Sequence, residues 1–264
     1  MTMAGRVNEG RTAAGTHSAE TDRALVDLAT SEADEAWLSR TRIFLQPIAA
    51  PSVMGLFGFA VATMMVGAWQ AGWYGDSSTP LILWPFTLVA GGLLQIIAAV
   101  ACFKARDSIA LGVHAIWGAF WLAWSTLQIL VALHVMAPLP LGSANGGFGF
   151  WFIGLALVTM SGFFASLAQS GLLAITLGTL SAGSALTAAG FWAGSLGTTR
   201  AGGWLFVISA AAAWLFATAM QLEGSFGRTI IPLGKLNAAS NIPGRSATRP
   251  IERAAGMPGV RVGQ

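Results

Sequence analysis

The side chains that could carry chemistry are few, and those inside the long apolar segments are uncharged. Among the amides of these segments we single out Gln95 and Gln128, and the histidines in or near the segments are His114 and His134. Nucleophilic catalysis needs a serine, histidine and carboxylate set, and general acid–base hydrolysis needs paired carboxylates. Neither combination occurs there, and the single cysteine offers no disulfide and no zinc spacing. We therefore expect no enzyme, no metal site and no cofactor.

These polar groups instead suit a binding or conduction path. An unpaired amide in hydrocarbon is costly, so Gln95 and Gln128 should face the interior of a bundle. The hydroxyl of Thr63, with those of other Ser and Thr residues, would line a neutral hydrogen-bonding path or bond back to its own helix. His114 is either a proton relay or a residue placed at the membrane interface without a special role.

The segments around these residues are those of a membrane protein. The sequence is 55% hydrophobic and 9% charged. Positions 43–222, 180 residues, contain as charged residues only Asp76, Lys104, Arg106, Asp107 and Arg200. Such a chain cannot cover a water-soluble surface, which excludes a soluble globular domain, a disordered protein and a nucleic-acid-binding domain. Nucleic acid is therefore not an expected partner, and the lipid bilayer is.

The turn residues divide this stretch into six apolar segments, each near the ~20 residues that cross a bilayer. Continuous apolar runs indicate helices and not the alternating strands of a barrel. The fold class is thus an all-α integral membrane protein with six transmembrane helices in one compact bundle. The last break is placed at Gly197–Gly203, around Arg200. The predicted spans are 52–73, 81–103, 109–134, 148–168, 172–195 and 202–222.

The basic residues predict the orientation and the domain limits. Arg200 is alone on one side, so the other side, with both termini, should be cytoplasmic. We expect a flexible N-terminal tail (1–41), a transport domain (42–235) and a flexible basic C-terminal tail (236–264), in the plasma (inner) membrane. The basic residues of the cytoplasmic side are Arg40, Arg42, Lys104, Arg106, Arg228 and Lys235.

Four strings resemble the acetate uptake transporter family, which includes the bacterial succinate–acetate permease and the fungal acetate permeases. They occur in order over about 185 residues with matching spacing. Ala50–Phe59 resembles the N-P-A-P-L-G-L-M-G-F signature, and Gly91–Ala98 resembles G-G-x-x-Q-x-x-A. Gly118–Leu122 matches G-A-F-W-L, and Phe226–Gly234 matches F-G-R-T-x-x-P-L-G.

The resemblance implies six helices around a central path, a hexamer, and passage of monocarboxylates or small dicarboxylates such as succinate, often with protons. It also implies a hydrophobic gate of three residues, which fall here on Phe59, Trp117 and Leu180. Ordinary core packing is the alternative reading of each. Several residues of the family pattern, a proline and otherwise polar ones, are replaced here. The replacements are Ala50, Val53, Gly67, Trp69, Cys102 and Ala123, with Val53 in place of the proline.

The missing charges also bear on mechanism. No Lys or Arg lies within the predicted spans to pair with a carboxylate, whose charge would cost several kcal/mol at the bilayer centre. The first span begins at Pro51 and Ser52, where free backbone N–H groups could bind a carboxylate or simply start the helix. We therefore expect passage of the neutral acid, or proton-linked transport. The alternatives are a non-transporting sensor or scaffold, and a pore for ammonia or water.

Overall fold

The computed structural model describes residues 49–105 and 107–235. In this part, six helical segments are long and apolar enough to cross a membrane. This confirms the predicted all-α fold of six membrane-spanning helices. The two predicted tails, 1–41 and 236–264, lie outside the described residues. The elements are α2 (Pro51–Gln70), α3 (Pro80–Phe86), η1 (Thr87–Leu93), α4 (Leu94–Ala105), α5 (Ser108–Ala132), α6 (Gly146–Ser166), α7 (Gly171–Ala193) and α8 (Leu196–Phe226).

The second span is one continuous helix made of α3, η1 and α4. Its middle part, η1, is a π-helix, in which each backbone N–H bonds five residues back and the turn is wider than in an α-helix. Pro85 lies just before it and cannot donate a backbone hydrogen bond. The wide turn contains Gly91 and Gly92, both buried against neighbouring helices.

Side chains placed just before the helices define where most of them begin. Asp107, Asn145, Ser170 and Ser195 each accept a hydrogen bond from the backbone N–H three residues later, at the starts of α5, α6, α7 and α8. Such caps satisfy backbone donors that the first helical turn leaves free. α2 begins instead at Pro51, whose missing N–H costs nothing in a first turn.

The predicted break at Gly197–Gly203 is wrong, because this stretch is helical and belongs to α8. Gly194, with φ of 61°, ends α7, and the next residue, Ser195, already caps α8. Arg200 therefore lies on a helix and not in a loop. Gly202 is needed for packing, since a Cβ there would lie 2.8 Å from the carbonyl oxygen of Gly183 on α7.

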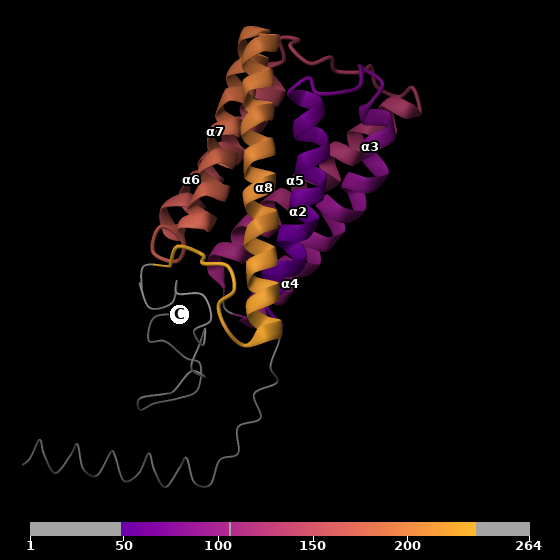
Figure 1. Ribbon diagram of the computed structural model, residues 1–264. Coiled ribbons are helices and arrows are strands. Elements are labelled where there is room, and N and C mark those ends of the chain that lie inside the picture. The colour runs from indigo at the N-terminus through magenta and orange to yellow at the C-terminus, as the bar shows by residue number, and fades with distance from the viewer. Residues whose placement is uncertain (1–48, 106, 236–264) are drawn as a thin grey trace, which may run out of the picture. The chain divides into compact units, whose positions relative to one another are not determined.

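The spans form a closed ring in which each contacts its two neighbours, in the order α2, α8, α7, α6, α5 and the second span. Figure 1 shows α8 between α7 and α2. The contact between α5 and α6 is the sparsest in this ring. We call the end at which α2, α5 and α7 begin the basic end, because Lys104 lies there, and the other the Arg200 end.

After α8, residues 227–235 return across the start of α7. The carbonyl of Leu233 accepts hydrogen bonds from Leu172 N at 3.2 Å and from Ser170 Oγ at 2.6 Å. The carbonyl of Gly234 accepts from Gly171 N at 3.0 Å. The string that follows the last span thus supplies the acceptors for the first N–H groups of α7.

Candidate functional site

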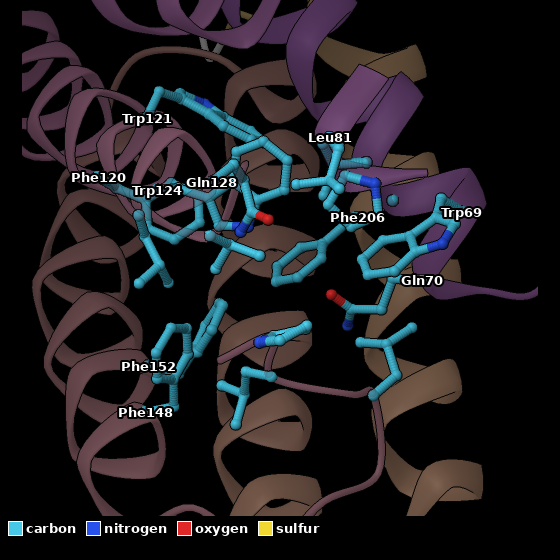
Figure 2. A pocket seen from close by; sticks show the side chains of 18 of the residues that line it. Trp69, Gln70, Leu81, Phe120, Trp121, Trp124, Gln128, Phe148, Phe152 and Phe206 are labelled. Carbon is cyan, nitrogen blue, oxygen red and sulfur yellow. The ribbon is translucent and has the colours of Figure 1, made fainter. Parts of the chain in front are cut away.

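The Gln128 cavity is a hollow of about 220 Å³ that extends from the Arg200 end into the bundle (Figure 2). It lies between α2, α3, α5, α6, α7 and α8 and the loops that join them. Nine of its 23 lining residues are aromatic, and none is charged. The aromatic residues of the wall are Trp69, Trp117, Phe120, Trp121, Trp124, Phe148, Phe152, Phe191 and Phe206.

Two amides enter this cavity from different sides, Gln70 from α2 and Gln128 from α5 (Figure 2). Gln70 is buried, and its Nε2 donates to Thr187 Oγ1 and to the Thr199 carbonyl, both at 2.9 Å. It therefore ties α2 to α7 and α8. Gln128 is half-buried.

The loop over the mouth of the Gln128 cavity is held by its own hydrogen bonds. Trp69 Nε1 donates to the carbonyl of Asp76 at 2.8 Å, and Ser77 and Ser78 form part of the wall. The Asp76 carboxylate accepts from Ser78 Oγ at 2.6 Å and from Ser78 N at 2.8 Å. These bonds favour the charged carboxylate and hold the pKa of Asp76 below its ordinary value.

The His114 cavity, of about 120 Å³, lies at the basic end. It is bounded by α2, α5, α7 and α8, and its polar residues are Ser52, Asp107, His114 and Gln169. Ser52 is the second residue of α2, directly after Pro51. The deepest part of the wall includes Leu56, His114 and Leu177.

The three predicted gate residues lie between the two cavities. Phe59, Trp117 and Leu180 each follow Leu56, His114 and Leu177 by three residues, about one helical turn farther from the basic end. All three are almost fully buried and belong to one apolar cluster. The rings of Phe59 and Trp117 meet edge to face with centroids 5.9 Å apart. Phe206 of α8 joins them, with its centroid 6.2 Å from that of Trp117.

The indole of Trp117 has a fixed orientation. Its Nε1 donates to Thr159 Oγ1 of α6 at 3.0 Å, and both residues are buried. Of the side-chain hydrogen bonds between described residues, this one alone joins α5 to α6. Trp117 therefore bridges the sparsest contact in the ring of helices.

A short relay of hydrogen bonds holds His114. Gln95 Nε2 donates to the carbonyl of Gly91 in the wide turn of η1 at 2.8 Å. Gln95 Oε1, an acceptor, lies 3.3 Å from His114 Nδ1, which therefore carries the proton. Nε2 of His114 is left as the acceptor. The ring packs against Gly55, where a Cβ would lie 2.5 Å from Cε1 of His114.

The structure thus separates the predicted pathway residues into two groups. Ser52 and His114 line the cavity at the basic end, while Thr63 and Gln128 line the other. Gln95 is fully buried and lines neither. The side chain of His114 is buried among the helices, with 3% of its surface exposed.

Sequence reasoning missed Gln70, Trp121 and Phe206. Gln70 was detectable as a further amide within a predicted span, like Gln95 and Gln128. Nothing in the sequence distinguishes Phe206 from Trp204, two residues earlier, which is exposed on the outer surface. Among the described residues, no group of His, Cys, Asp and Glu side chains could hold a metal ion.

Comparison with known proteins identifies the relatives of this chain. The succinate-acetate/proton symporter SatP of Escherichia coli K12 is 30% identical over 190 residues, which cover 71% of this chain and 96% of that protein. Ammonia transport outward protein 2 of Saccharomyces cerevisiae is 30% identical over 179 residues, 65% of this chain and 61% of that protein.

A solved structure has the same fold. The bacterial acetate channel SatP superposes with a TM-score of 0.64 at 26% identity, covering 71% of this chain and all of that one (100%). Residues 39–236 match the description of the GPR1/FUN34/yaaH family. The resemblance noted in the sequence is therefore confirmed, and the chain belongs to the GPR1/FUN34/yaaH family.

Proposed function

We propose that this protein is a membrane transporter or channel, and not an enzyme, for small monocarboxylic acids of the acetate type, with succinate as a further substrate. The observation that carries the proposal is the buried apolar cluster that contains Phe59, Trp117 and Leu180, which we take as a barrier between the two cavities. A barrier of this kind excludes ions by dewetting and larger solutes by size. The names of the SatP relatives support an acid as the solute.

The solute crosses the barrier as the neutral acid. The Gln128 cavity has no charged residue in its wall, so a carboxylate there would lack a counter-ion. An unpaired charge at the bilayer centre costs several kcal/mol, whereas a protonated acid carries none. Proton linkage follows, because each acid that crosses carries its proton with it.

His114 receives that proton on the side of the basic end. Its Nε2 is an acceptor because Gln95 holds the proton on Nδ1. Gln95 acts through His114 and does not touch the solute. Ser52 offers a hydroxyl in the same cavity, next to Pro51 at the start of α2.

We infer that the basic end faces the cytoplasm. Lys104, Arg228 and Lys235 lie at or beyond the helix ends there, and Arg200 lies at the opposite end. Basic residues in short loops favour the cytoplasmic side. We propose the plasma (inner) membrane as the location and a homo-oligomer, a hexamer by resemblance, as the assembly. Exposed apolar side chains such as Phe103, Phe150 and Phe164 suit contact with lipid or with other copies.

Flux through liposomes tests the proposal. The full chain is reconstituted, and uptake of labelled acetate, lactate, benzoate and succinate is compared with protein-free liposomes at pH 5.5 and 7, with and without an inward proton gradient. We expect protein-dependent uptake of the small acids that increases with the gradient. Leu180→Ala should admit benzoate, whereas Leu157→Ala, on the exposed surface of α6, should not.

Two outcomes would overturn the proposal in different ways. Protein-dependent passage of ammonia without any acid flux would favour an ammonia pore, which the name of the yeast relative supports. Absence of flux for every solute would favour a sensor or scaffold. If uptake by the His114→Ala variant equals that of the wild type, only the proposed role of His114 as proton acceptor is refuted.

A further inference from the structure

Two buried polar atoms in the wall of the Gln128 cavity have no hydrogen-bond partner. They are Thr63 Oγ1 of α2 and Trp121 Nε1 of α5, and each of these residues is 2% exposed. Buried donors and acceptors are nearly always paired in native proteins, since an unpaired one costs free energy. Because both residues line one cavity, a polar ligand held in that cavity is a candidate partner for the two atoms.

Thr63 differs from most threonines of the spans. Thr126, Thr176 and Thr187 donate to the carbonyl four residues earlier, as threonines in membrane helices usually do. Thr63 makes no such bond. Its hydroxyl is therefore free to donate or accept.

Trp121 is held by packing and not by its N–H group. A Cβ at Gly91 would lie 2.5 Å from Cγ of Trp121 and 2.8 Å from the Ala62 methyl. The rings of Phe120 and Trp124 meet the indole edge to face, with centroids 4.8 and 6.0 Å away. The indole and the helix turn that bears Thr63 thus meet at one glycine. This rigid arrangement fixes where the N–H group lies without using it.

The two groups match the polar end of a protonated carboxylic acid. Indole Nε1 can only donate, and a hydroxyl can do both. The carbonyl oxygen of the acid would accept from Trp121, and its O–H would donate to Thr63. A carboxylate would offer acceptors only and would add a charge to a cavity lined by none.

We propose that Thr63 and Trp121 form a binding subsite for the neutral carboxylic acid on the Arg200 side of the gate. The subsite rests on the proposed function. It gives Trp121 a part in substrate specificity, a role that does not follow from its place in the Gly118–Leu122 string. The remainder of the acid, a methyl group in acetate, lies against the aromatic wall. Acids with short apolar tails are therefore preferred.

The test uses the full chain in detergent and in liposomes. Binding is read as the rise in melting temperature on adding acetate at pH 4.5, and transport as the half-saturating concentration for uptake. Trp121→Phe and Thr63→Val each remove one hydrogen-bonding group. Each should raise the half-saturating concentration about three- to tenfold, the worth of one neutral hydrogen bond. Thr63→Ser keeps the hydroxyl and should retain near-native affinity.

Matched controls carry the same chemical changes elsewhere. Trp214→Phe on α8 and Thr126→Val on α5 alter exposed side chains outside the cavity and should leave affinity unchanged. The thermal shift with acetate should exceed that with ammonium chloride at equal ionic strength.

The outcomes separate the subsite from the function. If the wild type transports acids but Trp121→Phe and Thr63→Val match their controls in affinity, the subsite is refuted and the two atoms bind water only. If Trp121→Phe lowers the melting temperature even without acid, the half-saturating concentrations of Thr63→Val and Thr63→Ser are compared instead. A higher value in Thr63→Val alone supports the subsite, and equal values refute it. If the wild type transports no acid, the proposed function fails first.

Discussion

Replacing Thr159 by valine tests whether the gate depends on a fixed indole. Valine has the shape of threonine but cannot accept the hydrogen bond that Trp117 Nε1 donates at 3.0 Å. Both residues are buried, so the N–H group would find no water. The change also removes the side-chain hydrogen bond that joins α5 to α6.

The expected cost follows from the environment of this bond. A buried donor left unpaired costs about 1–3 kcal/mol, while hydrogen bonds between membrane helices average about 0.6 kcal/mol because unfolded segments find other partners. Since Trp117 is enclosed, we expect about 1–2 kcal/mol. At about 2–4 °C per kcal/mol for a domain of this size, the melting temperature should fall by about 2–8 °C.

The same change should loosen selection by the gate. An indole that lacks its anchor samples other positions, so the acetate-to-benzoate ratio in liposome uptake should fall about three- to tenfold for a loss near 1 kcal/mol. Thr159→Ser restores the acceptor and should restore both readouts. Thr126→Val, whose hydroxyl bonds within its own helix, is the control.

A double-mutant cycle isolates the bond. Trp117→Phe removes the donor, so no indole N–H group is left without a partner when Thr159→Val is added. The second change should then lower the free energy of unfolding by less than about 0.5 kcal/mol. Equal costs of Thr159→Val with and without the indole N–H would refute the account. So would an unchanged acid selectivity in a variant of lowered stability.

Three further predictions concern other parts of the site. Gly55→Ala places a Cβ 2.5 Å from Cε1 of His114, so the ring must leave Gln95, and acid uptake should fall at least about tenfold. The control Gly112→Ala, with open space around the added Cβ, should transport normally, and equal uptake rates in the two variants would contradict the role of His114. Gln70→Leu removes the two bonds to α7 and α8, so the melting temperature in detergent should fall by about 2–8 °C; an unchanged value would show that these bonds contribute nothing net. The pKa of Asp76 is lowered, so its contribution to stability is fully present above the ordinary pKa of an aspartate and is lost as the pH falls through the lowered pKa. The pH profile of uptake between 5 and 7 should therefore be the same in Asp76→Asn as in the wild type, and a shifted profile would show that a group in this loop titrates in that range.

The sequence predicts the number and order of the spans because a bilayer demands long apolar runs, which are visible without any tertiary contact. The start of α8 could not be predicted in this way. Arg200 and three nearby glycines resemble a loop, and the structure makes them helical because Gly194 and Ser195 complete the whole turn in two residues.

The sequence predicts whether a polar side chain is buried better than it predicts which partners that side chain contacts. Interior placement of Gln95 follows from the cost of a bare amide in lipid, and the residue is fully buried. Its engagement by Gly91 and His114, which removes it from the path, depends on the packing of α4 against α5. The missing partner of Trp121 is likewise invisible in sequence, because every tryptophan carries the same N–H group.

The π-helical turn in the second span changes how its sequence should be aligned. Leu83, Thr87, Gly91 and Gln95 are all buried at spacings of four, which in a straight α-helix would drift about 40° per step around the axis. The wider turn absorbs this drift and keeps them on one side. The span therefore contains one residue more than a straight helix would need. If the same residues formed a straight α-helix, the outer part of the span would be turned by about 100° and Leu83 and Thr87 would be carried toward the lipid. Deleting one residue of the wide turn would instead leave a straight apolar helix of spanning length with both residues still on the buried side.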